Sequence, residues 1–264
     1  MDMSDIKIGF IGFGNMASAM ADGWIASGKV APGKMSACAG RYEALIPRCE
    51  MRGMRALPDA TAVVEASDVV VVAVKPYMIE SVLAPLSEAL MGKVVLSVAA
   101  GWDCEAYERV IPGARHLSTV PNTPVAINEG VIACEKTSTL TDDDHELVYA
   151  LLGLLGHAVE VETRLLSVAG TVGGCSPAFI AMVIEALADA AVKHGIPRAT
   201  AYEMVSQMVA GTAKLQMATG MHPGAMKDAV CSPGGTTIRG VAELEAAGMR
   251  SASSTQSMQS RARL

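Results

Sequence analysis

Apolar residues in the first part of the chain occur as short unbroken runs with amphipathic segments between them. Five runs have the length and β-branched content of strands buried on both faces of a sheet, namely 7–13, 34–39, 68–74, 93–99 and 116–120. Two more, 130–133 and 158–162, are predicted to add strands at the sheet edge. A helix is predicted at 15–27, and helical or irregular segments are predicted between later strands, as at 79–91 and 103–110. This alternation predicts a parallel sheet with helices on both faces.

The strand pattern ends at residue 162, and the rest of the chain predicts helices. Ser176 and Pro177 are predicted as the N-cap and first residue of a helix that runs to His194, with Gly195 just after its end. Further helices are predicted at 197–220, 223–230 and 238–263. The fold class is therefore α/β, with an α/β domain over residues 1–162 followed by an all-α domain over residues 163–264.

The predicted helix over 178–192 is apolar on most of its circumference. Its charged residues Glu185, Asp189 and Lys193 lie on one stripe. A helix of this kind is buried on most sides. The helical domain is too short and too apolar to close a core alone, so we expect it to pack on a second copy of the chain. The expected assembly is a homodimer, with further association of dimers left open, and no folded monomer.

Composition and charge exclude several classes of partner. The 264-residue chain is 51% hydrophobic but only 4% aromatic, and its formal net charge is −6. Few rings and a negative charge argue against nucleic-acid binding, which uses stacking and cations. The longest unbroken apolar runs, such as 69–74, are too short to span a bilayer, so no membrane segment is expected. The acidic start leads directly into a strand, so no signal peptide is expected.

No metal site or disulfide is predicted. The six cysteines are scattered without a CxxC spacing, which fits reduced thiols in a cytoplasmic protein. The five histidines form no paired spacing with acids or thiols. The acidic run 142–144 follows Thr141, and we interpret it as a capped helix start whose acids favour the helix dipole.

A glycine-rich turn after the first strand has the dinucleotide-binding pattern G-x-G-x-x-[GA]. It comprises Gly12, Phe13, Gly14, Asn15, Met16 and Ala17. The first glycine permits the tight turn, the second lets the backbone approach a pyrophosphate, and the small Ala17 lets the helix pack closely. Its place directly after a strand and before a helix predicts a nucleotide site in a Rossmann domain.

The residues at the end of the second strand indicate which dinucleotide is preferred. The sequence there is Ala39-Gly40-Arg41-Tyr42, without the acid that binds the ribose 2′-hydroxyl of NAD. Arg41 is suited to pair with a 2′-phosphate, so NADP(H) is expected as the preferred cofactor and NAD(H) as the alternative. The other interpretation of Arg41 is a surface residue after a turn.

Two proline-containing segments follow strands that end at the ligand-binding edge of the sheet. They are Val74-Lys75-Pro76 and Val120-Pro121-Asn122-Thr123-Pro124. Ligands bind at this edge in open α/β sheets, although the prolines also serve to stop the strands.

A second glycine-rich turn precedes a helix near the end of the chain. It reads Ser232-Pro233-Gly234-Gly235-Thr236-Thr237. Flexible backbone, two hydroxyls and the unpaired N–H groups of a helix start together predict a cradle for a carboxylate or phosphate. A capped helix after a flexible turn is the alternative.

Taken together, these segments resemble the pyrroline-5-carboxylate reductase family over nearly the whole chain. The segments that carry the resemblance are 11–16, 74–76, 121–124, 185–190 with Gly195, 222–224 and 232–238, of which the last is the most specific. The resemblance implies a Rossmann domain followed by a helical dimerisation domain. It also implies hydride transfer from NAD(P)H to the C=N bond of L-1-pyrroline-5-carboxylate, which yields L-proline in the final step of proline biosynthesis.

Site roles follow from the same resemblance. It implies that Thr236 faces the ring nitrogen and that Ser232, Gly234, Gly235 and Thr237 contribute to the substrate site. It further implies contacts to the cofactor from Val74, Lys75, Pro76, Pro121 and Asn122. Where family members usually read Ser-Gly-Ser-Gly-Pro-Ala, this chain has Gly173-Gly174-Cys175-Ser176-Pro177-Ala178, so the weaker donor Cys175 stands at a substrate-binding position.

Three alternatives remain open from the residues. One is a related cyclic-imine oxidoreductase. The second is an enzyme similar to the β-hydroxyacid dehydrogenases, which carry a catalytic lysine on the first long helix after their glycine turn, whereas residues 178–192 contain none. The third is a noncatalytic NADP-binding oligomer.

Overall fold

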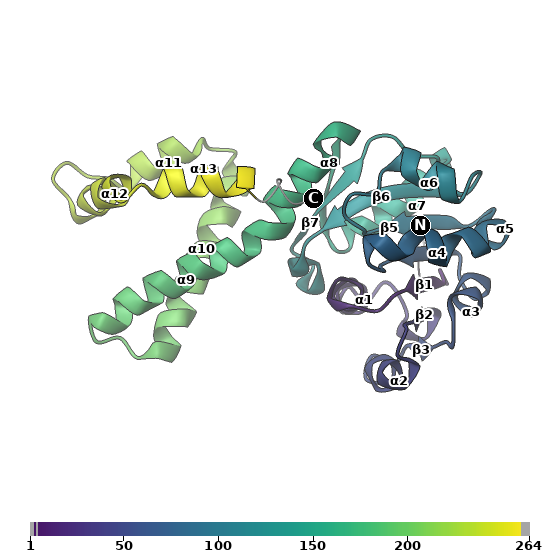
Figure 1. The fold of residues 1–264 in the computed structure, drawn as a ribbon. Coiled ribbons are helices and arrows are strands. Elements are labelled where there is room, and N and C mark those ends of the chain that lie inside the picture. The colour runs from purple at the N-terminus through teal and green to yellow at the C-terminus, as the bar shows by residue number, and fades with distance from the viewer. Residues whose placement is uncertain (1–2, 4, 260–264) are drawn as a thin grey trace. The chain divides into compact units, whose positions relative to one another are not determined.

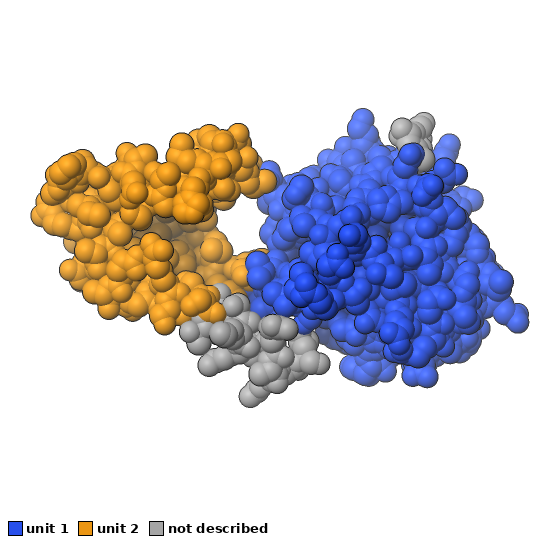
Figure 2. Space-filling view, turned by 90° about the horizontal axis from the view of Figure 1, so that it is seen from above, with its two compact units in different colours: residues 1–175 blue, residues 176–264 orange. Residues whose placement is uncertain are grey.

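The computed structural model describes Met3 and residues 5–259, with side chains described as far as Ser254. The chain forms two compact units, residues 1–175 and 176–264, which Figure 2 colours separately. The predicted domain boundary at residue 162 lies at the start of the helix that joins them, and it stays a prediction.

The first unit contains an eight-stranded sheet in the order β3-β2-β1-β4-β5-β6-β7-β8. The strands are β1 (Ile8–Ile11), β2 (Met35–Cys38), β3 (Arg55–Ala56), β4 (Val69–Val72), β5 (Val94–Ser97), β6 (Arg115–Pro121), β7 (Gly130–Glu135) and β8 (Gly156–Val161). All seven predicted strands are confirmed, and β7 and β8 lie at one edge as expected. The short β3 at the other edge was missed. Adjacent strands pair in parallel except β6 and β7, which are antiparallel.

Helices cover both faces of this sheet (Figure 1). They are α1 (Asn15–Ala26), α2 (Tyr42–Glu50), α3 (Ala60–Glu65), α4 (Ile79–Leu83), α5 (Ser87–Leu90), α6 (Cys104–Val110), α7 (Asp142–Gly153) and α8 (Thr163–Gly170). Four 3₁₀ turns join them, η1 (Pro32–Lys34), η2 (Pro76–Met78), η3 (Ala84–Leu86) and η4 (Thr123–Ile127). The segment predicted as helical or irregular over 79–91 contains α4 and α5, which η3 separates because Pro85 cannot donate the backbone hydrogen bond that an α-helix needs.

The buried valines of β4 show why two cores form. Val69 and Val71 belong to one hydrophobic cluster, and Val70 and Val72 belong to the other. Successive strand residues point to opposite faces, so an unbroken apolar run fits a sheet that is covered on both sides. This confirms the interpretation of the runs as buried strands.

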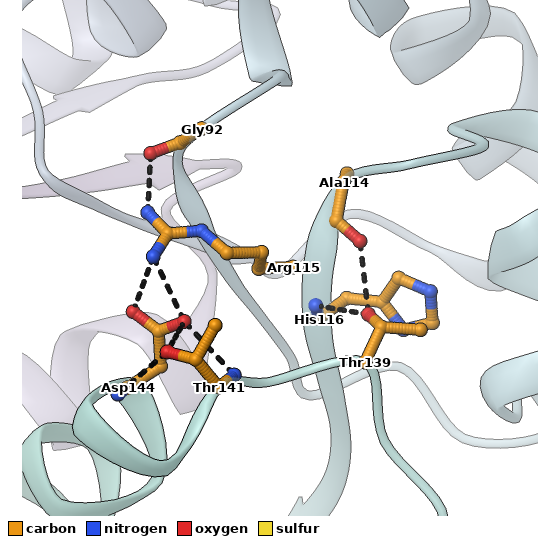
Figure 3. A network of polar contacts seen from close by, with 7 residues as sticks. All are labelled: Gly92, Ala114, Arg115, His116, Thr139, Thr141 and Asp144. Atoms are coloured by element: carbon orange, nitrogen blue, oxygen red, sulfur yellow. Dashed lines mark hydrogen bonds and ion pairs between the residues drawn. The ribbon is translucent and has the colours of Figure 1, made fainter.

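The predicted cap at Thr141 is confirmed and belongs to a larger network (Figure 3). Thr141 and Asp144 form a capping box at the start of α7. The Asp144 carboxylate also accepts from Nη1 of Arg115 at 2.6 and 2.8 Å, and Arg115 donates to the carbonyl of Gly92. The network ties α7 to β6 and to the loop before β5.

One long helical segment leads out of the first unit. Helix α8 continues through a π-helical turn, η5 (Thr171–Cys175), into α9 (Ser176–Lys193). Helix α9 begins at Ser176, within one residue of the prediction, but Ser176 is not an N-cap outside the helix, because the π-helical turn runs directly into it. A proline in the helix interior removes one backbone donor, and the wider π turn immediately before it accommodates that loss. The predicted end is confirmed, since Gly195 follows the helix with φ of +94°.

The second unit consists of helices. After α9 come α10 (Arg198–Thr219), α11 (Pro223–Ala229), α12 (Thr236–Ala246) and α13 (Met249–Gln259). The predicted end of α10 is confirmed by Gly220, which is left-handed with φ of +63°. The helical stretch predicted over 238–263 consists of two helices as far as it is described, because Gly248 with φ of +78° separates α12 from α13. The end of that prediction, residues 260–263, lies outside the described residues.

Most apolar side chains of the second unit are exposed within a single chain. Among its described residues only Ala188 and Ala201 are buried. The segment Thr163–Lys193 has a mean hydropathy of 1.7 in its most apolar part, of which 6% is buried, and by length and composition it is long and apolar enough to cross a membrane. The sequence prediction considered unbroken apolar runs and did not foresee this segment.

Candidate active site

A cavity of about 790 Å³ lies at the carboxyl ends of the central strands of the first unit. Nine of the eleven predicted cofactor residues line it, namely Gly12, Phe13, Gly14, Asn15, Met16, Arg41, Val74, Lys75 and Pro76. Strand β1 lies between β2 and β4 here, so the connections diverge to opposite sides of the sheet. Such a switch point is where open α/β sheets bind ligands.

The N-terminus of α1 opens onto this cavity without a cap. Its hydrogen bonds begin with the Ser18 N–H, which donates to the Gly14 carbonyl, and no side chain caps the preceding N–H groups. Its first turn carries no acidic residue. In contrast, α3 and α6 are capped by Asp59 and Asp103. Free donors on a 12-residue helix fit a pyrophosphate.

The two glycines of the turn are needed for different reasons, one for the fold and one for the ligand. Gly12 has φ of +90°, and a Cβ there would lie 2.8 Å from the Ala73 carbonyl oxygen. Gly14 has φ of −82°, and a Cβ there would meet nothing within 4 Å. Gly12 is therefore required by the chain itself, whereas the space beside Gly14 is free for a ligand.

The charge of the cavity wall is one-sided. Its basic residues are Arg41, Arg48 and Lys75, and no Asp or Glu lines it. Arg41 lies at the start of α2, just beyond the end of β2. The wall thus fits a ligand with several negative charges, such as a phosphorylated dinucleotide. Sequence reasoning missed Arg48, although its spacing of seven residues from Arg41 places both on one face of a helix.

The other two predicted cofactor residues, Pro121 and Asn122, are not among the lining residues, whereas the next residue, Thr123, is. The Asn122 side chain is buried and its amide is already engaged. Its Nδ2 donates to the Gly173 carbonyl at 3.1 Å, and its Oδ1 accepts from the Val131 N–H at 3.0 Å. A cofactor contact from Pro121 or Asn122 therefore stays a prediction.

The predicted anion cradle lies in the second unit, where it precedes α12. The Gly235 N–H donates to the Ser232 carbonyl at 3.0 Å, and Gly234 is left-handed with φ of +69°. A Cβ at Gly235 would lie 2.4 Å from Oγ of Ser232, which can rotate away, and 3.1 Å from the Ser232 carbonyl oxygen, so a side chain here would crowd the turn. No side chain caps α12 and no acid lies in its first turn, so the N–H groups next to Thr236 and Thr237 are free for an anion.

Arg239 supports the cradle in a way that the sequence analysis missed. Its Nη2 donates to the Gly234 carbonyl at 3.2 Å and its Nε to the Gly235 carbonyl at 3.3 Å. The guanidinium thus holds both glycine carbonyls from the first turn of α12. It also adds positive charge to a helix N-terminus that lacks acids.

The cysteines divide by environment. All six are free; Cys175 is exposed at the end of the π turn in the first unit, and Cys231 is half-buried beside the cradle in the second. Burial raises the pKa of Cys104 to about 11 and that of Cys134 to about 12, so both stay protonated at neutral pH. Among the described residues, no group of three or more His, Cys, Asp or Glu side chains is placed to hold a metal ion.

Comparisons with known proteins agree with this arrangement. Residues 163–263 match the family described as pyrroline-5-carboxylate reductase dimerisation, and residues 7–101 match the family described as NADP oxidoreductase, coenzyme F420-dependent. The chain is 41% identical over 252 residues to the pyrroline-5-carboxylate reductase of Treponema pallidum, covering 94% of this chain and 95% of that protein. It is 39% identical over 248 residues to that of Escherichia coli, covering 93% and 92%.

Solved structures give the same relationship. The pyrroline carboxylate reductase of Plasmodium falciparum, solved with NADP bound, superposes with a TM-score of 0.87 at 25% identity and covers 97% of this chain and 96% of that one. The enzyme of Streptococcus pyogenes gives 0.84 at 29% identity, with 96% of each chain covered. A Streptomyces aurantiacus imine reductase gives 0.56 at 18% identity over 94% of this chain and 88% of its own, which shows a shared fold alone.

Proposed function

The chain belongs to the pyrroline-5-carboxylate reductase family, and from that premise we propose that it reduces the C=N bond of L-1-pyrroline-5-carboxylate to L-proline with NAD(P)H. The observation that carries the proposal is the 41% identity to a pyrroline-5-carboxylate reductase over 94% of the chain. A cavity with three cations and no acid, in a chain of net charge −6, supports the binding of an anionic dinucleotide.

The reaction requires the protein mainly to bind and orient the substrate and the cofactor. A bound nicotinamide supplies the hydride. The ring nitrogen of the substrate, once protonated, makes the imine carbon electrophilic. This carbon is C2 of the pyrroline ring and becomes C5 of proline. Hydride addition there and electron shift to nitrogen give the secondary amine directly. No side chain has to remove a proton in this step. The protein gains rate by holding the reacting atoms in line.

We assign the substrate carboxylate to the cradle before α12. The N–H groups of the first turn donate to the carboxylate, while Gly234 and Gly235 give the backbone room to curve around it. The Thr236 hydroxyl is proposed to hydrogen-bond the ring nitrogen, which fixes the ring and stabilises its protonated form. Ser232, Thr237 and Cys175 are proposed as further substrate-site residues.

The dinucleotide is assigned to the cavity of the first unit. The free N–H groups of α1 beside Gly14 would hold the pyrophosphate, and Val74, Lys75 and Pro76 would form the wall after β4. Pro121 and Asn122 are proposed to act on the nicotinamide side. NADP(H) is proposed as the preferred cofactor, because Arg41 stands where an NAD site carries an acid.

The apolar surface of the helical unit is proposed to be the interface of a homodimer. The family match described as pyrroline-5-carboxylate reductase dimerisation covers residues 163–263. This range includes the exposed and strongly apolar segment Thr163–Lys193. Burial against a second copy would remove this surface from water. We also propose that the protein works in the cytoplasm. A monomeric mass by light scattering at micromolar concentration would contradict the dimer.

The decisive experiment follows NADPH oxidation with pyrroline-5-carboxylate for the wild type, Thr236→Ala and Thr236→Ser. We expect turnover in the wild type, a loss of about tenfold or more in kcat/KM for the alanine variant, and partial recovery with serine. Wild-type protein that binds NADPH but does not turn over would exclude the reductase and leave the noncatalytic oligomer. Turnover of a β-hydroxy acid instead would favour the dehydrogenase alternative.

A further inference from the structure

One face of α2 lines the dinucleotide cavity. Its lining residues are Arg41, Ala44, Leu45 and Arg48, at the spacings that bring side chains to one side of a helix. The two arginines stand at the ends of this face, with the small Ala44 and the buried Leu45 between them. A negatively charged group over this face would therefore meet a guanidinium from each end.

The position of Arg48 is fixed by neighbours that leave its charge uncompensated. Its Nη2 donates to Oγ of Ser18 at 2.7 Å, and its guanidinium carbon lies 5.2 Å from the centroid of the Phe13 ring. Phe13 is 3% exposed and packs edge-on against Phe10, so the ring provides a firm platform. Within the described part of the chain, no carboxylate forms an ion pair with Arg48.

Arg52 provides the contrast within the same helix region. Its guanidinium carbon lies 5.7 Å from the same Phe13 ring, but its Nε and Nη2 donate to the Asp22 carboxylate at 2.6 and 2.9 Å. It does not line the cavity. Both arginines thus lie against the Phe13 ring. Arg52 is paired with a carboxylate, whereas Arg48, which lines the cavity, has no carboxylate partner among the described residues.

We propose that Arg48 acts with Arg41 as a second guanidinium for the 2′-phosphate of NADPH, and that it helps set the preference for NADPH over NADH. The pyrophosphate has its own donors at the start of α1, next to Gly14. The 2′-phosphate is the remaining strong anion, and it lies beyond the end of β2, which is where α2 begins. This inference rests on the proposed function for the identity of the cofactor.

The test measures binding of two fragments by calorimetry, so that it does not depend on catalysis. The fragments are 2′,5′-ADP and 5′-AMP, which differ only in the 2′-phosphate. We expect Arg48→Met to weaken 2′,5′-ADP by about tenfold or more, the worth of one charge-assisted hydrogen bond, and to change 5′-AMP less than about twofold. Arg48→Lys should recover part of the loss, and Arg41→Met with Arg48→Met should lose more than either alone.

Arg52→Met is the matched control, because it removes a guanidinium from the same ring without touching the cavity. It should leave the ratio of the two affinities unchanged. Equal weakening of both fragments by Arg48→Met, or the same change of ratio with Arg52→Met, would overturn the inference. Reductase turnover with an unchanged NADPH-to-NADH ratio in Arg48→Met would overturn it while sparing the proposed function. If the ratio of the two fragment affinities depends on Arg48 but the wild-type protein shows no reductase turnover, the inference would stand and the proposed function would be contradicted.

Discussion

The side-chain amide of Asn122 joins the end of β6 to the carbonyl of Gly173 in the π-helical turn, with an Nδ2 to oxygen distance of 3.1 Å. In a regular α-helix this carbonyl would accept from the residue four positions later, but that residue is Pro177, which has no N–H. The amide oxygen of Asn122 is held in turn by the Val131 N–H. Asn122 thus fixes the π turn next to the strand end where a ligand is expected.

Replacing Asn122 tests this function. Asn122→Ala leaves a half-buried carbonyl and a half-buried N–H without their partner, which should cost about 1–2 kcal/mol of stability and also lower turnover by displacing the turn. Asn128→Gly is the matched control. The Asn128 amide also makes two hydrogen bonds to backbone groups, in this case the carbonyls of Gly23 and Leu154, and Asn128 does not line the cavity. Denaturation and steady-state rates should show both variants destabilised but only the first slowed. Equal turnover in both would contradict the role.

The glycine-rich turn predicts opposite effects for two alanine variants. Gly14→Ala adds a methyl group to open space at an ordinary φ, so the fold should keep its stability while NADPH binding weakens by about tenfold or more, because the phosphate loses its close approach. Gly12→Ala forces a positive φ and a clash with the Ala73 carbonyl, so it should lose about 1–3 kcal/mol of stability. The measurements are fluorescence titration with NADPH and thermal unfolding. A stable, tightly binding Gly14→Ala protein would contradict the assigned phosphate position.

The Asp144 network predicts a large difference between two neighbouring acids. Asp144→Ala removes the cap interaction with Thr141 and leaves the guanidinium of Arg115 unpaired, which should cost about 3 kcal/mol. Asp143→Ala, on the exposed side of the same first turn, should cost no more than about 0.5 kcal/mol. Chemical denaturation of both variants checks this expectation. Similar losses would mean that helix-dipole effects alone account for the acidic run.

Buried thiols predict a loss of stability at alkaline pH. The pKa values of Cys104 and Cys134, about 11 and about 12, lie above the 9.0 of an unperturbed thiol because burial disfavours the thiolate. As the pH rises above 9, the unfolded chain releases these protons first, so the free energy of unfolding should fall with a slope that approaches about 1.4 kcal/mol per pH unit for each thiol. Burial also raises the pKa of Cys38 and Cys49, in the same direction.

Unfolding measured between about pH 9 and 10 checks the size of this effect. The double variant Cys104→Ala and Cys134→Ala should have a shallower slope of stability against pH than the wild type. Cys175→Ala, which removes an exposed thiol, should leave the slope unchanged. Equal slopes in all three proteins would show that the buried thiols do not control alkaline stability.

Much of the fold could be predicted from local sequence. The valines of β4 indicated a strand buried on both faces, and Gly195 and Gly220 marked helix ends, because a left-handed residue follows many helices. The glycine-rich turn before Asn15 was likewise placed correctly, since its pattern couples a strand to a helix start. These signals depend on neighbours in sequence.

Some of the missed features depend on contacts between distant residues. The continuous path from α8 to α9 could not be predicted, because Pro177 is typical of a helix start and only the π turn lets it stand inside one. The role of Arg48 was missed because it depends on Phe13 and Ser18, which meet α2 only after the sheet has formed. Arg239 was missed for a different reason: its partners lie only four and five residues away, but they are backbone carbonyls rather than an acid.

Hydride transfer to the imine carbon can be followed with isotope-labelled cofactor. Wild-type protein is incubated with pyrroline-5-carboxylate and NADPH that carries two deuterium atoms at C4 of the nicotinamide, and the product is analysed by mass spectrometry and NMR. We predict L-proline with a single deuterium at C5, formed in equal amount to the NADPH consumed. Proline without deuterium, or cofactor oxidation without proline, would exclude direct hydride transfer to the imine by this protein.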